Sequence, residues 1–401
     1  MKKRVYMDYA STTPLDPRVF KVMTPFFLEK IGNPSSIHFE GVLAKKGLEE
    51  SRVKVAKILQ AHADEIIFTS GGTESNNLAI FGVVKNLEKS GLSIAKMHFV
   101  TTVIEHSSVL ECFRELESRG AKVDYAPVKS NGIVDPKIIE KLLRRETVLV
   151  SIGYTNNEIG TIQPLREVSK IIKNLSAVKG QESIIKGFSS LIFHTDASQA
   201  PLYLDCMTER LGVDLMTLDG HKMYGPKGVG ALYVKRGNLI QPIFEGGGQE
   251  RGFRATTENV PAIVGFAKAF EIAVSMRIKE SARLEKLRNY FYSKVLQNTG
   301  IEGLGNITVN GDLNERLPNN INISVTGLDA EFAVLKLDAR GIACSTKSSC
   351  LGSEGGSYVV RALGGSAKRS LESLRFTFGR STVKADIDYL LIQLKSIIAK
   401  P

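Results

Sequence analysis

The residue best suited to do chemistry in this chain is Lys222, which lies in the segment Asp219-Gly220-His221-Lys222-Met223-Tyr224-Gly225-Pro226. An apolar run, residues 213–218, precedes this segment, and another, residues 228–234, follows it. Both runs predict buried strands. A lysine at the end of a buried strand can be desolvated, so that it loses its proton near neutral pH and attacks a carbonyl carbon. The segment therefore predicts a lysine that binds a carbonyl compound covalently.

A glycine-rich turn provides a second candidate site. Residues 70–77 read Ser-Gly-Gly-Thr-Glu-Ser-Asn-Asn and separate a predicted strand from a predicted helix. Glycines let successive backbone N–H groups curl around an anion, and the N-terminus of the following helix favours negative charge. We expect Gly72 and Thr73 to form a phosphate cradle. The alternative is a simple turn in which Thr73 caps the helix.

Asp196 follows the predicted strand 191–195 and is the third candidate. A carboxylate at this point could pair with a protonated pyridine nitrogen and keep the ring an electron sink. The alternative is that Asp196 caps the next helix. One strand and its crossover separate Asp196 from Lys222, so both can reach the carboxyl edge of one sheet. Lysine, phosphate cradle and aspartate together suit pyridoxal 5'-phosphate (PLP).

Two further polar residues also follow predicted strands. His106 could stack on a cofactor ring and transfer protons, although a lone histidine often has only a structural role. Asn157 could donate a hydrogen bond to the ring oxygen of the cofactor; the alternative is a turn residue. Both positions again point to the carboxyl edge of the predicted sheet.

Residues 341–356 are small, polar and rich in glycine, which predicts an exposed, mobile loop. Cys350 lies in this segment near Lys347, and an exposed thiol beside a cation is more reactive than a buried one. Cys344 stands at the apolar start of the segment and is expected to pack in a core. The other two cysteines, Cys112 and Cys206, are expected to be structural.

The composition narrows the class of protein. The chain has 401 residues, of which 43% are hydrophobic, and a formal net charge of +11. No apolar run approaches the roughly 20 residues of a membrane span, and no signal-peptide pattern follows the basic start. We therefore expect a soluble, cytoplasmic protein. The basic residues form no patch interleaved with aromatic residues, so no direct nucleic-acid binding is expected. The four cysteines lack the spacing of a zinc site.

The elements that must position these residues alternate along the chain. Strand-like and helical runs follow one another, which favours an α/β fold with a mostly parallel sheet. The expected strands are residues 65–69, 97–102, 122–128, 147–155 and 191–195, and the expected helices are residues 73–89 and 107–119. A long helix, residues 260–298, leads to a second region with strands at 320–325 and 374–378 and a helix at 384–399. Residues 174–190 are expected to be a surface insertion.

With these residues in place, nearly the whole chain resembles the PLP-dependent cysteine desulfurases of the NifS/IscS type. These enzymes belong to the class V aminotransferase-like branch of fold type I. The segments that carry the resemblance are residues 7–14, 32–36, 70–77, 156–160, 194–199, 219–228, 246–250 and 375–380.

The resemblance implies a PLP-dependent transferase fold of type I with two domains. The large domain, residues 15–260, would hold a mostly parallel seven-stranded sheet. The small α+β domain would consist of residues 1–14 and 261–401, with the mobile loop of the catalytic cysteine near residues 341–356.

The resemblance also implies the role of each site residue. Catalytic roles fall to Cys350, Lys222 and His106, and Lys222 would hold PLP as a Schiff base. Arg375 would bind the carboxylate of the substrate together with Asn157. The residues that would bind PLP are Gly72, Thr73, His106, Asn157, Asp196, Gln199, His221, Lys222 and Thr257. Of these, Thr257 would act in the other subunit of a homodimer.

The implied reaction converts L-cysteine to L-alanine and leaves the sulfur on Cys350 as a persulfide. The implied partner is a sulfur acceptor protein, either an iron–sulfur scaffold or a thiolation enzyme. Two alternatives stay open: a selenocysteine lyase or other class V PLP enzyme, and a non-catalytic scaffold with the PLP fold. Asp219 departs from the pattern, because it stands where a serine commonly contacts the phosphate. We expect its carboxylate to point elsewhere or to be paired, and do not count it in the site.

Overall fold

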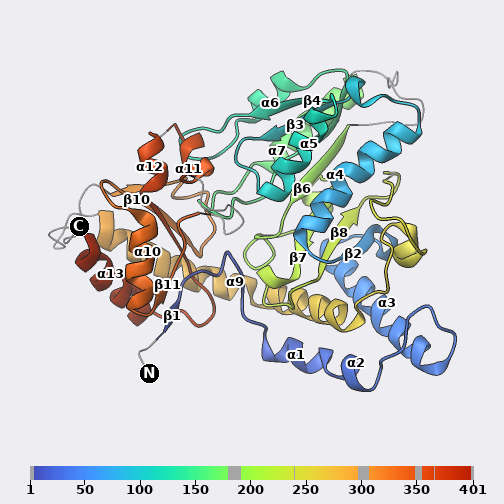
Figure 1. The fold of residues 1–401 in the computed structure, drawn as a ribbon, viewed down its shortest axis with the longest axis horizontal. Coiled ribbons are helices and arrows are strands. Elements are labelled where there is room, and N and C mark those ends of the chain that lie inside the picture. Colours follow the sequence, from blue (N-terminus) through green and yellow to red (C-terminus); the bar gives the residue numbers. More distant parts are fainter. Residues whose placement is uncertain are drawn as a thin grey trace.

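The described residues form three sheets, of seven, three and two strands. The computed structural model describes residues 4–178, 191–238, 240–296, 307–347, 355–364 and 366–398. Figure 1 shows a larger part built on a seven-stranded sheet and a smaller part built on a three-stranded sheet. The helix α9 (Val260–Leu296) runs along both parts.

The larger sheet has the strand order β2-β8-β7-β6-β5-β3-β4. Strand β8 is antiparallel to both of its neighbours, and every other pair in this sheet is parallel. The strands are β2 (Ile66–Thr69), β3 (His98–Thr102), β4 (Lys122–Ala126), β5 (Thr147–Ser151), β6 (Ile192–Asp196), β7 (Leu215–Asp219) and β8 (Gly230–Val234). The predicted α/β class with a mostly parallel seven-stranded sheet is confirmed.

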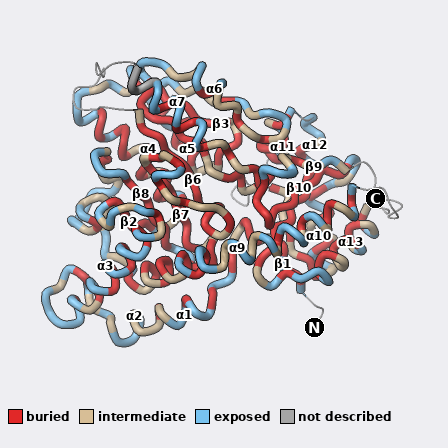
Figure 2. Tube along the Cα trace, turned by 180° about the vertical axis from the view of Figure 1, so that it is seen from behind, coloured by how far each residue is buried: buried red, intermediate tan, exposed pale blue. Residues whose placement is uncertain are grey.

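Both faces of this sheet are buried, as expected for parallel strands. Successive residues of one strand enter opposite cores: Ile67 packs on one side and Phe68 on the other. One core includes α4 (Gly72–Lys89) and α5 (Ser107–Ser118). The other includes α3 (Phe39–Leu59), α6 (Pro136–Leu142), α7 (Leu165–Val178) and the first half of α9. Figure 2 shows the strands as a buried layer between more exposed helices.

The smaller part has its own core around an antiparallel sheet of order β12-β10-β9. Its strands are β9 (Ile307–Val309), β10 (Asn320–Val325) and β12 (Ser373–Thr377). The N-terminal strand β1 (Val5–Tyr6) joins this part by pairing with β11 (Ile342–Ala343). The helices here are α10 (Ala330–Ala339), α11 (Tyr358–Ala362), α12 (Ala367–Leu371) and α13 (Lys384–Ile398).

Helix α9 links the two cores. Its 37 residues span about 55 Å at 1.5 Å per residue. Phe266 and Phe270 in its first half pack in the larger part, whereas Phe291 and Val295 near its end pack in the smaller part. The helix therefore contributes buried side chains to both cores.

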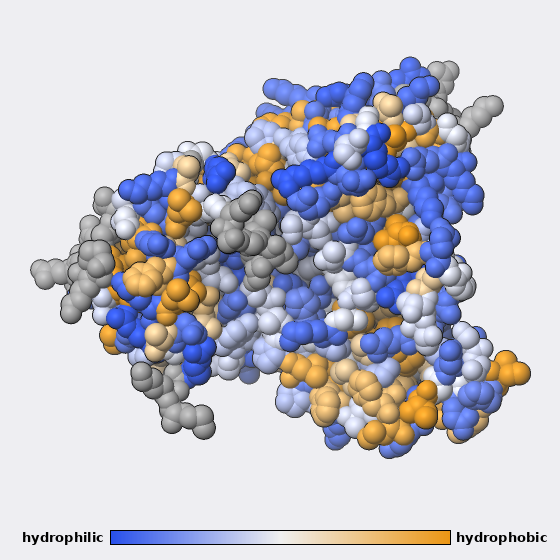
Figure 3. All heavy atoms as spheres, viewed as in Figure 1, coloured by the Kyte–Doolittle hydropathy of each residue, from blue (hydrophilic) through white to orange (hydrophobic). Residues whose placement is uncertain are grey.

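The short helices near the N-terminus leave hydrophobic side chains exposed. These helices are α1 (Pro17–Met23) and α2 (Pro25–Leu28). Figure 3 shows hydrophobic residues gathered over them at the lower edge of the molecule. Phe20 and Phe27 are each 56% exposed and Leu28 is 72% exposed. Scattered exposed hydrophobic residues are normal, but a gathered patch of large ones indicates an interaction surface.

Two segments differ from the sequence-based expectation. Residues 342–347 are not an exposed loop, because β11 pairs with β1 and Ser345 pairs with Arg375. Lys347 is buried, with its ammonium nitrogen 3.6 Å from the carboxylate of Glu331. Cys350 lies outside the described residues. Of the predicted insertion, residues 174–178 belong to α7 and the rest also lies outside them.

None of the helices in the described part of the chain combines the length and the apolar character needed to cross a bilayer.

Candidate active site

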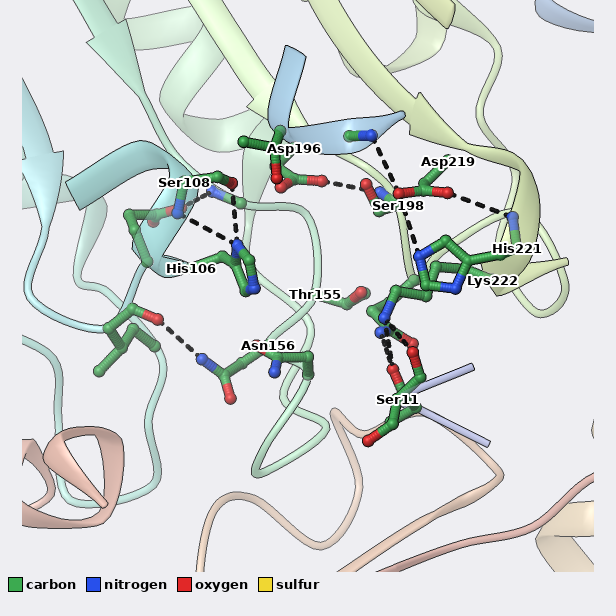
Figure 4. Close-up of a pocket in the computed structure, with 18 of the residues that line it drawn as sticks. Ser11, His106, Ser108, Thr155, Asn156, Asp196, Ser198, Asp219, His221 and Lys222 are labelled. Carbon is green, nitrogen blue, oxygen red and sulfur yellow. Dashed lines mark hydrogen bonds and ion pairs between the residues drawn. The ribbon is translucent and has the colours of Figure 1, made fainter. Parts of the chain in front are cut away.

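A cavity of about 960 Å³, including its open mouth, lies at the carboxyl ends of the parallel strands (Figure 4). The segments that follow β2, β3, β5, β6 and β7 line it, together with residues 10–11 and one residue of β12. The structure brings together most of the predicted site residues here: Gly72, Thr73, His106, Asn157, Asp196, Gln199, His221, Lys222 and Arg375.

Lys222 ends a single 3-10 turn, Gly220–Lys222, directly after the buried strand β7. Its Nζ donates hydrogen bonds to the carbonyl oxygens of Ala10 and Ser11, at 2.8 and 2.7 Å. The N-terminal segment thereby holds the lysine in the cavity (Figure 4). A fixed amine at the end of a strand is suited to attack a bound carbonyl carbon.

The turn between β2 and α4 adopts the conformation expected of an anion cradle. Gly71 has a φ of 149°, which disfavours other residues, and α4 begins at Gly72. A Cβ atom on Gly72 would lie 3.1 Å from both the Ser198 Oγ and the Asp219 Oδ2. Glycine thus keeps this corner of the cavity open. The Glu74 carboxylate accepts a hydrogen bond from the Ser70 amide at 2.7 Å and so braces the turn.

A hydrogen-bonded chain connects Asp196 to His106. The Asn76 Nδ2 donates to the Asp196 Oδ2 and to the Ser108 Oγ, both at 2.8 Å. The Ser108 Oγ lies 2.8 Å from the His106 Nδ1. The other carboxylate oxygen of Asp196 accepts a hydrogen bond from the Ser198 amide at 2.9 Å. Each oxygen of Asp196 therefore has a donor, which holds the carboxylate in one orientation.

His106 is also the N-cap of α5, because its Nδ1 accepts a hydrogen bond from the Ser108 amide at 3.2 Å. An Nδ1 that accepts leaves the proton of the neutral ring on Nε2. The ring lines the cavity. His106 therefore caps α5 and also lies where proton transfer would require it. The sequence had offered these two roles as alternatives.

Glu105, beside His106, is a titratable residue that the sequence did not single out. Its carboxyl accepts hydrogen bonds from the Thr102 hydroxyl at 2.6 Å and the Gly153 amide at 2.8 Å. Burial raises the pKa of Glu105 to about 7. The residue ties the loop after β3 to the loop after β5.

Two adjacent asparagines in the loop after β5 make different contacts. The side chain of Asn156 accepts hydrogen bonds from two amides within its own turn and donates to the carbonyl oxygen of Ile104 at 2.8 Å. Asn157 lines the cavity, and its backbone oxygen accepts a hydrogen bond from Arg375 at 3.1 Å. On the next loop, the Gln199 Nε2 donates to the carbonyl oxygen of Ala10 at 2.9 Å.

Arg375 reaches the cavity from β12 of the smaller part and is 1% exposed. Its Nη2 lies 2.8 Å from both the Asp8 carboxylate and the Ser11 Oγ. Within the described part of the chain, its buried Nε has no hydrogen-bond partner. A desolvated guanidinium with an unpaired N–H is suited to bind a carboxylate.

Asp219 corrects the expectation that placed it outside the site. Its carboxylate lines the cavity, and its Oδ2 accepts a hydrogen bond from the Gly72 amide at 2.9 Å. Its Oδ2 also lies 3.3 Å from the His221 Nε2. Burial raises the pKa of Asp219, but the bond to His221, the charge of His221 and the Gly72 amide outweigh it, so the net pKa is lowered. The expectation that Asp219 is paired is correct.

Two predicted residues do not appear in this cavity. Thr257 is exposed and lines a separate hollow of about 590 Å³, together with Ser70, Gly228 and Arg254. Cys350 lies outside the described residues, so its position relative to the cavity stays a prediction.

The other three cysteines are packed in the cores, as expected. Cys112, Cys206 and Cys344 are all buried. Burial raises the pKa of each of these thiols to about 12. At neutral pH they are therefore protonated and weak nucleophiles.

Sequence reasoning missed the residues that support the site rather than face it. Asn76, Ser108, Ser198 and Ser11 each hold a predicted residue or line the cavity. One signal was available: Asn76 follows Gly72 by four residues on the same helix, so both lie on one face. The partners of Asn76 come from other loops, and local sequence does not report them.

The residues present fit PLP. The amide of Gly72, the first of α4, donates to an anionic oxygen, that of Asp219, so it points to where an anion is stabilised. Lys222 and the oriented carboxylate of Asp196 line the same cavity, so a carbonyl group and a ring nitrogen could each meet a partner.

Comparisons with known proteins establish the family. The family model described as aminotransferase class-V matches residues 5–390. This chain belongs to that family. The curated cysteine desulfurase IscS of Dictyoglomus turgidum is 44% identical over 401 residues, which cover 100% of this chain and 96% of the relative.

Solved structures of similar proteins support the same family. A NifS-like protein superposes with a TM-score of 0.87 at 36% identity, covering 99% of this chain and 100% of the other. A structure described as SspA in complex with cysteine gives a TM-score of 0.77 at 31% identity, covering 95% and 100%. The predicted family, fold type and PLP-dependent cysteine desulfurase chemistry are confirmed.

Proposed function

We propose that this chain transfers the sulfur of L-cysteine to the thiol of Cys350, which leaves a persulfide on the enzyme and L-alanine as the other product. The carbon–sulfur bond of the substrate breaks, and a proton takes the place of the sulfur. The observation that carries the proposal is that Lys222 and Arg375, from the two separate cores, line one cavity in a chain whose full-length relatives are cysteine desulfurases.

The residues of the cavity support distinct tasks. PLP, when bound, supplies an electron sink for the charge that develops at the substrate Cα. Arg375 would bind the substrate carboxylate, and its unpaired buried Nε supports this task. The amine of Lys222 and the Nε2 of His106 would move protons at the substrate. Asp196 would hold the proton of the ring nitrogen, in an orientation braced by Asn76.

The chemistry of the other cysteines supports Cys350 as the sulfur acceptor. Sulfur transfer needs a thiolate. The three thiols within the described residues have their pKa raised to about 12 by burial. Cys350 is the fourth of four cysteines in the chain.

The assembly and the cellular setting are part of the same proposal. The chain would act as a homodimer, in which Thr257 of one copy contributes to the phosphate site of the other. The hydrophobic side chains gathered over α1 and α2 support burial of that surface. We further propose two domains, residues 15–260 and residues 1–14 with 261–401. Two separate cores support a division into two domains, although the first half of α9 packs in the larger core. A cytoplasmic iron–sulfur scaffold or thiolation enzyme would receive the sulfur.

One experiment tests the central step. The holoenzyme is incubated with L-cysteine, alanine is quantified, and the persulfide is located by peptide mass spectrometry. The expected result is alanine in step with a persulfide on Cys350. The variant Cys350→Ser should lose sulfur transfer but retain PLP, whereas the control Cys344→Ala should keep both. A persulfide on Cys344, or unchanged turnover in Cys350→Ser, would contradict the proposal.

A further inference from the structure

Asp219 places a negative charge inside the phosphate cradle. Its side chain is 11% exposed, and its Oδ2 accepts the hydrogen bond of the Gly72 amide at 2.9 Å. Its Oδ1 accepts a hydrogen bond from the His221 amide at 3.2 Å. Figure 4 shows the carboxylate beside His221 and Ser198, facing the cavity.

The carboxylate and a bound phosphate would compete for the same donor. The Gly72 amide has one hydrogen, and it is the first amide of α4, where an anion is best stabilised. Since Asp219 already accepts that hydrogen bond, a phosphate oxygen must displace the carboxylate or share the amide with it. Two negative groups in one largely buried corner also repel each other.

The side chains that favour the charged form of Asp219 offset this repulsion only in part. Those that act on it are His221, whose Nε2 lies 3.3 Å away, and Lys222. The Nζ of Lys222 donates hydrogen bonds to the carbonyl oxygens of Ala10 and Ser11. The pKa of Asp219 is lowered despite its burial, so the carboxylate stays charged at neutral pH.

We propose that Asp219 sets the phosphate specificity of the cofactor site: it occupies the cradle before the cofactor binds and weakens the affinity for the 5'-phosphate. The inference rests on PLP being the cofactor. It predicts that this chain distinguishes PLP from pyridoxal, which lacks the phosphate, less sharply than a variant with a neutral residue at position 219.

The test compares two ligands on the apoprotein. PLP is removed with a carbonyl reagent, and equilibrium dialysis then gives the dissociation constants of PLP and of pyridoxal. Both ligands can bind Lys222 covalently, so their affinity ratio isolates the phosphate subsite. In Asp219→Ser the ratio should shift toward PLP by at least about tenfold, equivalent to about 1.4 kcal/mol. Pyridoxal affinity should change little. Asp219→Asn keeps the shape and removes the charge, and should give a smaller shift in the same direction.

Asp214, next to the start of the same strand, offers a matched control. Asp214 directly precedes β7, pairs with Lys235 at 3.2 Å and accepts a hydrogen bond from the Phe193 amide at 3.0 Å. Asp214→Asn makes the same change of charge away from the cavity. The ratio of PLP affinity to pyridoxal affinity in this variant should therefore equal that of the wild type. If Asp219→Ser does not fold, the affinity ratio of Asp219→Asn alone tests the inference.

Two results would overturn the inference. A ratio that is unchanged or shifted toward pyridoxal in both Asp219 variants would mean that Asp219 positions His221 rather than opposing the phosphate. That result leaves the proposed function intact. Failure of every protein, including the wild type, to take up PLP would instead overturn the cofactor assignment together with this inference.

Discussion

The two parts of the molecule contribute to the cavity in different ways. The larger sheet presents residues on turns that directly follow its strands, and hydrogen bonds join these turns to one another, as in the chain from Asp196 through Asn76 to His106. The smaller part contributes Arg375 from within β12, and its partner Asp8 lies 367 residues away in the sequence.

This difference suggests a division of labour, in which the larger part binds the cofactor and the smaller part binds the substrate carboxylate. Groups that must hold a cofactor ring in one orientation lie on a single braced edge of one sheet. Arg375, the group proposed to bind the substrate carboxylate, comes from a separate core, so its distance from Lys222 depends on how the two parts pack. Changes on the larger sheet should therefore alter cofactor binding, and changes at Arg375 should alter substrate binding.

The largest effect should come from Lys222→Ala. Removing the amine would eliminate the proposed covalent link to the cofactor and a proposed proton-transfer group, so turnover should fall by about 10⁴-fold. Alanine production measures turnover, and the visible absorbance of the protein reports the bound cofactor. Retention of a tenth of the wild-type turnover would contradict the role of Lys222.

Glu105→Gln tests the contribution of Glu105, which joins two loops at the edge of the larger sheet. The measured quantity is the pH dependence of the free energy of unfolding. The folded-state pKa of Glu105 is raised from 4.5 to about 7, mainly by burial. The folded state therefore binds more protons than the unfolded state between these values. Stability should be full below pH 4.5 and should fall by about 3 kcal/mol as pH rises through 7. Urea unfolding at pH 5 and pH 7.5 measures most of this difference, about 2 kcal/mol.

In Glu105→Gln that pH dependence should shrink, because glutamine does not titrate. The hydrogen-bond geometry toward Thr102 and Gly153 is largely kept. A pH dependence equal to that of the wild type would show that other groups cause it.

Arg375→Lys tests whether a change in the smaller part alters substrate binding without altering cofactor binding. Lysine cannot reproduce the planar fork that contacts Asp8, Ser11 and Asn157. The kcat/KM for L-cysteine should fall by about 100-fold, mainly through KM, while PLP affinity stays at the wild-type value. A parallel loss of PLP affinity would break the proposed division of labour.

The smallest effect should come from Asn76→Ala, which removes the donor shared by Asp196 and Ser108. One lost hydrogen bond to a charged group lowers affinity by about tenfold. PLP affinity should fall by that amount, with little change in KM for L-cysteine. A change in KM alone would place Asn76 on the substrate side.

Much of the fold could be predicted from local patterns. The apolar alternation of residues 320–325 predicted β10 with its observed bounds, and the helix expected from residue 73 begins one residue earlier. The period of the apolar residues identified the type of each element. It did not show that all six positions of β10 are buried. The loop expected at 341–356 was partly wrong, because the pairing of β11 with a strand more than 300 residues away leaves no local signal.

The sequence alone predicted a chemical role for Lys222, Asp196 and His106, because each of these side chains follows a predicted strand whose end must reach the sheet edge. Only the tertiary structure decided which side chains meet. It brought Arg375 to Asp8, joined Asp196 to His106 through Asn76, and turned the Asp219 carboxylate into the cradle at Gly72. The physical reason is that residue type and spacing encode local burial, whereas a hydrogen bond between distant loops depends on the packing of the whole chain.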